Sequence, residues 1–328
     1  MTVVITGAAG FLGQRLARKL LQCGTLATSD GRQAPIERLV LLDVVRATDF
    51  GDPRVRVIAA DLTDPSVVRD AIDADVTSVF HLAAVVSGQA EADFDLGMRV
   101  NLDASRLVLE ACRASGRTPR VLFTSSVAVY GGELPARVDD TTPLTPQSSY
   151  GMQKAVGELL LSDYTRKGFI DGRVARLPTI SVRPGKPNQA TSSFASGIIR
   201  EPLNGEIAVC PVGTELRLWL LSPRRAIENL IGVHELPSDA LRANRNVNLP
   251  GVSVSVARMI DALRVVGGEE AVGRIRFERN PVIERIVGSW PAGWDVSRAT
   301  SLGLRGDASF EAIVRAYVED DLKPARSN

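Results

Sequence analysis

The chain has 328 residues, of which 45% are hydrophobic and 23% are charged, and its formal net charge is +1. A chain of this size and composition can bury a sizeable core as one large domain or two unequal ones, and its balanced charge gives no reason to expect a nucleic-acid partner. No apolar stretch approaches the ~20 residues of a membrane span, and MTVVITGAAG at the start has no basic leader, so we expect a cytoplasmic protein without a membrane partner.

Short β-branched runs alternate with longer segments of helical period in the first half of the chain. The predicted strands are 2–6, 38–44, 54–60, 76–84, 120–126 and 172–178, and the predicted helices are 11–22, about 65–73, about 92–114 and about 150–167. Most of the strand segments are nearly all apolar, as expected of parallel strands covered on both faces. The alternation predicts an α/β fold of Rossmann type, with a doubly wound parallel sheet.

The pattern changes after about residue 178. Segment 179–194 is rich in Pro, Ser and Asn and predicts a long loop of the kind that lines sites. Helical patterns at 222–236 and 253–268 flank a short strand at 246–249, and 309–322 predicts an amphipathic helix with Ser309 as N-cap. We expect residues 1–178 to form the Rossmann-type domain, with segments from about 220–265 returning to it, and most of 179–328 to form a smaller C-terminal α/β lobe.

Three glycines lie directly between the first predicted strand and the first predicted helix. Gly7 suits a tight turn, Gly10 lets the backbone approach a pyrophosphate, and Gly13 permits close packing of helix on strand. The phosphates would face the free N–H groups at the start of the helix. This spacing in this setting predicts a dinucleotide-binding loop.

Acidic residues end the second and third predicted strands. A carboxylate at Asp43 would hydrogen-bond both ribose hydroxyls of NAD and repel the 2′-phosphate of NADP, although Arg46 is close enough that NADP is not excluded. Asp61 is either the N-cap of the helix that starts near Pro65 or a partner for an adenine amino group. NAD is therefore the expected cofactor.

A serine, a tyrosine and a lysine form a possible catalytic group. Ser126 leaves the carboxyl end of the fifth strand, where ligands bind in open α/β sheets, and Tyr150 and Lys154 are one turn apart on the next helix. The usual tyrosine pKa of about 10 makes a poor base, but a neighbouring ammonium and a positive nicotinamide ring would lower it. We predict that Tyr150 is a general base, that Ser126 holds the same substrate oxygen, and that Lys154 also binds the nicotinamide ribose.

Cysteines and histidines are too few and too scattered to predict a disulfide framework or a metal site. The chain holds three cysteines without a CxxC pair and two histidines. We therefore expect no metal.

Short motifs spread over nearly the whole chain carry a family resemblance. They are TGAAGFLG (6–13), DLTD (61–64), HLAA (81–84), NLDAS (101–105), TSSVAVYG (124–131), YGMQK (150–154), NVNLPG (246–251) and DVSRATSLGL (295–304). Together with Asp43 they resemble an extended short-chain dehydrogenase/reductase of the NAD-dependent epimerase/dehydratase group.

The resemblance implies roles for named residues and a homodimer paired through the helices near 92–114 and 150–167. It gives the catalytic roles to Ser126, Tyr150 and Lys154. The implied cofactor contacts are Gly7, Gly10, Phe11, Leu12 and Gly13 at the pyrophosphate, Asp61 and Leu62 at the adenine, and Ala83, Asn101, Tyr150, Lys154, Pro178 and Thr179 elsewhere along NAD.

Departures from the family pattern bear on the reaction. Dehydrating members resemble one another in an acidic pair within the segment that is here Ser126–Val127–Ala128, so dehydration is not expected. Nucleotide-sugar epimerases usually show an RDFIHVDD-like stretch, and the corresponding LRLWLLSPRRAIENL keeps Arg217 but lacks the histidine and the acidic pair.

Basic and hydroxyl side chains after residue 178 suit a small polyol that bears a carboxylate, because arginine can hold a carboxylate bidentately. They are Thr179, Arg183, Lys186, Ser192, Ser193, Arg217 and Arg224. The predicted substrate contacts are Ser126, Tyr150, Thr179, Arg183, Arg217 and Trp219, although each arginine has a structural alternative and Trp219 suits a core equally. We expect NAD-dependent oxidation of a small sugar acid; the alternatives are a nucleotide-sugar epimerase and a non-catalytic NAD sensor or scaffold.

Overall fold

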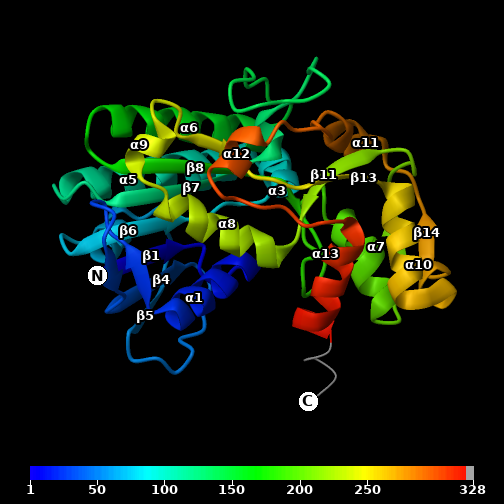
Figure 1. The fold of residues 1–328 in the computed structure, drawn as a ribbon, viewed down its shortest axis with the longest axis horizontal. Helices are drawn as coiled ribbons and strands as arrows, with labels where there is room; N and C mark the ends of the chain where they lie inside the picture. The colour runs from blue at the N-terminus through cyan, green and yellow to red at the C-terminus, as the bar shows by residue number, and fades with distance from the viewer. Residues whose placement is uncertain (323–328) are drawn as a thin grey trace.

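The computed structural model describes residues 1–322, and its largest element is a sheet of seven strands (Figure 1). The strand order is β12-β8-β7-β6-β1-β4-β5, and every pairing is parallel. The bounds are β1 Thr2–Thr6, β4 Arg38–Asp43, β5 Val55–Ala59, β6 Val76–His81, β7 Arg120–Ser126, β8 Asp171–Leu177 and β12 Asn246–Asn248. The predicted Rossmann-type sheet is confirmed.

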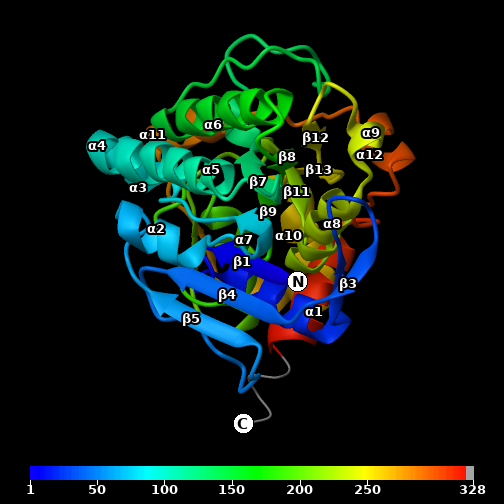
Figure 2. The same cartoon turned by 90° about the vertical axis from the view of Figure 1, so that its left-hand side faces the viewer.

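Helices cover both faces of this sheet (Figure 2). One face carries α1 Phe11–Cys23 and α8 Pro223–Glu235, and the other carries α2 Pro65–Ala71, α5 Ala104–Ala114 and α6 Ser149–Arg166. The side chains of β1 alternate between the two cores: Val3 and Ile5 belong to the core of α1 and α8, whereas Val4 belongs to that of α2, α5 and α6. Burial on both faces explains the continuous apolar runs.

The chain reverses its direction of growth across the sheet at β1. It adds β4 and β5 on one side and then returns to place β6 on the other. The carboxyl ends of β1 and β6 therefore meet at a topological switch point, where ligands bind in open α/β sheets.

The later part of the chain builds a smaller lobe with its own core. It contains α7 Phe194–Leu203, α10 Val256–Val272, α11 Pro281–Gly288 and α13 Phe310–Tyr317, a sheet of β9 Thr179–Ile180, β11 Arg217–Leu221 and β13 Val252–Ser255, and the pair β10 Ala208–Cys210 and β14 Ile275–Phe277. Of the later segments, α8 and β12 lie on the large sheet, whereas β13 and α10 pack within this lobe. The domain boundaries themselves stay a prediction.

Several elements differ from the sequence-based expectation. The predicted helix 92–114 consists of α3 Ser87–Ala92, α4 Phe94–Gly97, a π-helical turn at Met98–Asp103, and α5. Asp93 interrupts it, because its extended backbone starts α4 and its side chain accepts a hydrogen bond from the Leu96 amide. A hairpin of β2 Thr25–Ala27 and β3 Gln33–Pro35 was not predicted, and neither were the short helices α9 Ser238–Leu241 and α12 Ser297–Ser301.

The predicted C-terminal helix is present as α13. Ser309 caps it as predicted, with its hydroxyl accepting a hydrogen bond from the Ala312 amide at 3.1 Å, and the chain continues as a π-helical turn at Val318–Leu322. Within residues 1–322, no helix has the length and apolar character needed to cross a membrane.

Candidate active site

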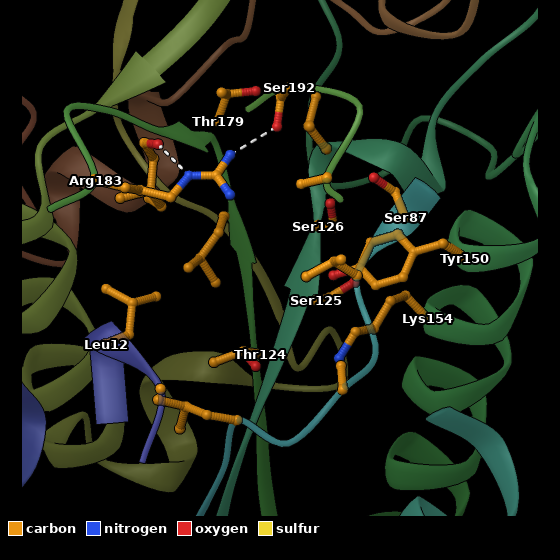
Figure 3. A pocket seen from close by; sticks show the side chains of 18 of the residues that line it. Leu12, Ser87, Thr124, Ser125, Ser126, Tyr150, Lys154, Thr179, Arg183 and Ser192 are labelled. Carbon is orange, nitrogen blue, oxygen red and sulfur yellow. Dashed lines mark hydrogen bonds between the residues drawn. The ribbon is translucent and has the colours of Figure 1, made fainter. Parts of the chain in front are cut away.

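A cavity of about 380 Å³ opens at the carboxyl ends of the central strands, between the large sheet and the smaller lobe (Figure 3). Its walls come from the glycine loop after β1, the ends of β6, β7 and β8, the start of α6, and the segment after β8. The predicted residues in the lining are Gly7, Gly10, Phe11, Leu12, Gly13, Ser126, Tyr150, Lys154, Pro178, Thr179 and Arg183. Segments far apart in sequence therefore share one cavity.

The glycine loop leaves no room for side chains at two positions. Gly7 has φ +72°, and a Cβ there would lie 2.6 Å from the Ala83 amide nitrogen. A Cβ on Gly13 would lie 2.3 Å from the Gly7 carbonyl oxygen. Gly10 is the N-cap of α1, whose first turn carries no acidic residue, so free N–H groups face the cavity without a competing negative charge. These residues fit the pyrophosphate of a dinucleotide.

Asp43 braces the glycine loop from the neighbouring strand. Its carboxylate accepts hydrogen bonds from the amides of Ala9 at 2.9 Å and Val45 at 3.1 Å. Asp61 is exposed and accepts from the Thr63 amide at 2.8 Å, and the N-cap of α2 is Asp64 instead. Asp43 and Asp61 lie outside the cavity lining, and so does Leu62, which is part of the core under α2.

Asn101 fixes the segment that follows β6. Its side-chain oxygen accepts from the Val85 amide at 2.8 Å, and its amide group donates to the Val85 carbonyl at 3.2 Å and to Gln153 at 2.8 Å. It is buried in the π-helical turn and joins that turn both to the cavity wall and to α6. Ala83 contributes its backbone at the closest approach of the glycine loop but is not in the lining.

His81 belongs to a buried hydrogen-bond chain with a defined direction. The Ser105 hydroxyl donates to the Asn101 carbonyl at 2.6 Å, so it accepts from Nε2–H of His81 at 2.9 Å. Nδ1 of His81 then accepts from the Thr6 hydroxyl at 2.6 Å. Burial, and after it the charge of Lys154, lowers the pKa of His81 to about 3. His81 is therefore a neutral structural residue.

Tyr150, at the start of α6, lies next to Ser126, at the end of β7. Ser148 caps this helix by accepting from the Gly151 amide at 3.2 Å, which places Tyr150 in its first turn. Burial raises the pKa of Tyr150 to about 12, while a hydrogen bond with Ser126 and the positive charge of Arg183 act in the opposite direction. The net pKa of Tyr150 is raised here, because desolvation of the phenol outweighs the hydrogen bond with Ser126 and the charge of Arg183.

Lys154 points into the cavity from the same face of α6 (Figure 3). Its Nζ lies 4.6 Å from the centre of the Phe123 ring and 5.8 Å from that of Tyr150. Burial lowers the pKa of Lys154 to about 7, and the charge of Glu158 opposes this effect. Within residues 1–322, Nζ makes no ion pair, so its protons can reach a ligand.

Arg183 occupies the opposite wall from Tyr150 (Figure 3). Its Nη2 donates to the Ser192 hydroxyl at 2.8 Å and its Nε to the Ile180 carbonyl at 3.1 Å. Burial lowers the pKa of Arg183 to about 10, with Tyr150 opposing and Arg200 assisting. In the part of the chain that the structure describes, no carboxylate pairs with Arg183.

Two predicted substrate residues lie elsewhere. Arg217 is exposed on β11 and donates to the side chain and carbonyl of Ser253, both at 3.2 Å. Trp219 is buried against Trp294, with ring centres 5.8 Å apart, and its indole donates to the Leu249 carbonyl. Neither lines the cavity: Arg217 is the exposed first residue of β11, and Trp219 belongs to a buried cluster with Trp294.

Other basic residues suggested by the sequence also lie outside. Lys186 is exposed, and Arg224 pairs with Glu319 at 3.0 Å and with Asp320 at 2.6 Å. Thr179, Arg183 and Ser192 are the members of that predicted group that line the cavity.

The structure adds lining residues that sequence reasoning did not select as site residues. They are Leu82, Ala84, Val86, Ser87, Thr124, Ser125, Val127, Leu177, Ile180, Asn188, Ala190 and Trp290. Most of these residues lie at the end of a predicted strand or directly after it, and this position was the sequence feature that could have indicated them. Trp290 comes from the loop after α11, and nothing in its local sequence indicated the site.

The segment after β9 forms a thin wall. It is anchored to α3 by Thr191, whose hydroxyl is 3.0 Å from that of Ser87 and whose amide donates to Ser87 Oγ at 3.2 Å. Behind this wall lies a second hollow of about 650 Å³, and Asn188 and Ala190 line both spaces.

Comparison with known proteins identifies the relatives of this chain. A family described as "NAD dependent epimerase/dehydratase family" matches residues 3–222. A D-erythronate dehydrogenase from Cupriavidus necator is 64% identical over 320 residues, covering 98% of both chains. One from Haemophilus influenzae is 48% identical over 323 residues, covering 98% of this chain and all of the relative.

A solved structure shares the whole fold. It is described as the nucleoside-diphosphate-sugar epimerase from Agrobacterium tumefaciens, with a TM-score of 0.91 and 44% identity. The similarity covers 98% of this chain and 95% of that one.

We predict that Gly13→Ala abolishes measurable NAD binding. The added methyl group would collide with the Gly7 carbonyl and displace the loop that faces the pyrophosphate. Isothermal titration calorimetry with NAD measures the loss, and circular dichroism reports whether the fold persists. Gly273→Ala is the matched control, since a Cβ there meets its neighbours at an ordinary 3.5 Å; NAD binding by Gly13→Ala at wild-type affinity would contradict the prediction.

Proposed function

The chain belongs to the NAD dependent epimerase/dehydratase family, and from this membership and the geometry of the cavity we propose that it oxidises D-erythronate to 2-dehydro-D-erythronate with NAD. We infer an acidic substrate from the guanidinium of Arg183. It faces Tyr150 across the cavity and has no carboxylate partner among residues 1–322. A desolvated cation in this setting favours a ligand that brings its own negative charge. The similarity to D-erythronate dehydrogenases supports the four-carbon acid.

The proposed roles follow the order of groups along the cavity. The substrate carboxylate binds Arg183, with Thr179 and Ser192 beside it, so that the neighbouring hydroxyl lies at Tyr150 and Ser126. Tyr150 removes the hydroxyl proton and Ser126 holds the oxygen. NAD, when bound, supplies the acceptor for the hydride from the same carbon.

The cofactor would lie along the switch point. Gly7, Gly10, Phe11, Leu12 and Gly13 would hold its pyrophosphate at the start of α1, and Asp43, Asp61 and Leu62 would hold the adenosine end. Ala83, Asn101, Lys154, Pro178 and Thr179 would form or support the nicotinamide end. Residues 1–178 would thus serve as the NAD-binding domain, and most of 179–328 as the substrate lobe.

The proposal also includes a cytoplasmic location and a homodimeric assembly for the protein. The free cysteines Cys23, Cys112 and Cys210 fit the reducing cytoplasm. A homodimer paired through the α5–α6 side is supported by two exposed apolar side chains, Leu159 on α6 and Phe94 on α4.

Nucleotide-sugar epimerisation is the second candidate, because the Agrobacterium relative carries that description. A substrate panel separates the two. We predict that D-erythronate reduces NAD stoichiometrically, measured as NADH absorbance, and that UDP-sugars produce neither NADH nor epimers. Epimer formation without net NADH would contradict the dehydrogenase proposal.

Tyr150→Phe should lower kcat by roughly 10²–10⁴-fold while NAD binding survives, since it removes a general base and keeps the ring. For the wild-type enzyme, kcat/KM for oxidation should rise with pH from about 6 to 9, because burial raises the pKa of Tyr150 to about 12 and the phenolate fraction grows with pH below that value. Steady-state kinetics and NAD titration measure both effects. Unchanged turnover by Tyr150→Phe would reject the assignment.

Arg183→Met should raise KM for D-erythronate by about 100-fold, because it removes a desolvated charge pair with the substrate. The dissociation constant for NAD should stay near the wild-type value. Arg217→Met is the matched control, since it removes an arginine outside the cavity. If Arg217→Met raised KM and Arg183→Met did not, the two assignments would be reversed.

A further inference from the structure

A buried ion pair lies on the face of α6 that carries Lys154, one turn further along the helix. Glu158, one turn after Lys154, is 1% exposed, and Arg176 of β8 is 2% exposed. Nη2 of Arg176 donates to Oε2 of Glu158 at 2.6 Å, and Nε donates to Oε1 at 2.9 Å. Both oxygens of Glu158 are therefore fixed by one guanidinium.

The pair connects to the cavity wall on one side and to the sheet on the other. The Ser125 hydroxyl donates to Oε1 of Glu158 at 2.5 Å, and Ser125 lines the cavity next to Ser126. Nη1 of Arg176 donates to the Tyr130 hydroxyl at 2.5 Å, which lies 3.0 Å from Oδ1 of Asn248 on β12. The carboxylate is thus part of a continuous polar network rather than a side chain with unused acceptors.

The ammonium form of Lys154 needs a nearby negative charge to stabilise it. Its ammonium is buried, lies over two aromatic rings and has no ion-pair partner in the described chain, so desolvation drives it toward the neutral amine. The carboxylate that opposes this effect is Glu158, four residues away on the same helix face.

The other charged or titratable groups near Lys154 do not replace this contribution. These groups are Tyr150 of α6, the neutral His81 of β6, Arg176 of β8 and Arg183 of the segment after β9. The two arginines are positive and the other two are uncharged at neutral pH. Among residues 1–322, Glu158 is therefore the acidic group whose charge acts on Lys154.

We propose that Glu158 is a positioning residue that favours the ammonium form of Lys154 beside Tyr150, while Arg176 holds the carboxylate of Glu158 in place. The charge of Lys154 in turn favours the phenolate of Tyr150. The part of this role that concerns turnover rests on the proposed function, whereas the protonation of Lys154 is a property of the protein alone.

Glu158→Gln tests the proposal, because it removes the charge and keeps a side chain of the same size. The chain contains five lysines, so selective ¹³C labelling at Cε gives a simple NMR spectrum in which Lys154 is assigned by its loss in Lys154→Met. The wild-type resonance should titrate near pH 7, and Glu158→Gln should move its midpoint down by about one pH unit. An unchanged midpoint overturns the proposal.

Two further variants control for damage to the fold. Glu158→Gln leaves Arg176 buried without its partner, which destabilises the protein, whereas Glu158→Gln with Arg176→Gln removes both charges. Because the double variant also removes the positive charge of Arg176, its Lys154 midpoint should lie between those of Glu158→Gln and the wild type. A midpoint above the wild-type value would overturn the proposal. Asp163→Asn, an exposed acid-to-amide change on the same helix, should leave the midpoint unchanged, and an equal shift there would count against Glu158.

Kinetics supply the second readout. With Glu158→Gln, kcat/KM for oxidation should fall roughly three- to fivefold near pH 7, because a smaller fraction of Lys154 is then charged to favour the phenolate. The loss should shrink above about pH 9, where Lys154 is neutral in both proteins. A uniform loss at every pH would indicate a structural role and overturn the proposal. If the Lys154 midpoint shifts as expected but the wild-type protein oxidises no sugar acid, the proposed function fails and the assignment of Glu158 to Lys154 stands.

Discussion

The passage of Gly7 past the backbone of Ala83 is the contact on which the rest of the site depends. It occurs where β1 and β6 diverge, and any Cβ at Gly7 would lie within 2.8 Å of several Ala83 and Leu82 atoms. The Ala83 amide donates to Thr6 Oγ1 at 3.3 Å, and Thr6 continues the chain through His81 and Ser105 to Asn101. One close approach therefore fixes the glycine loop, the wall after β6 and the turn next to α6 together.

The electrostatics of the cavity follow from the burial of its ionisable groups. Burial moves the pKa of Tyr150 upward and those of Lys154 and Arg183 downward, so each group is pushed toward its neutral form. Opposite charges counteract this push: Glu158 acts on Lys154, and the proposed substrate carboxylate would act on Arg183. The site is thus built to gain its working charges from partners rather than from solvent.

The sequence predicted the elements whose signal is local. The apolar strands, the glycine spacing, the Ser309 cap and the four-residue separation of Tyr150 and Lys154 each depend on neighbours along the chain, and the structure contains each of them. Arg183 and Arg217 looked alike in sequence, because their separation into cavity and surface depends on where the segment after β9 and the start of β11 lie in the folded lobe. The break at Asp93 and the place of Trp290 likewise required tertiary contacts that no local pattern encodes.

The wall shared by the two hollows has a consequence for how substrates change during evolution. Asn188 and Ala190 separate the reaction cavity from the space behind it by a single thickness of chain. Insertions, deletions or smaller residues in this loop would extend the cavity into a volume that already exists. The residues proposed to handle the proton and the cofactor lie on other elements, so acceptance of a longer acid would require no change in the proposed chemistry.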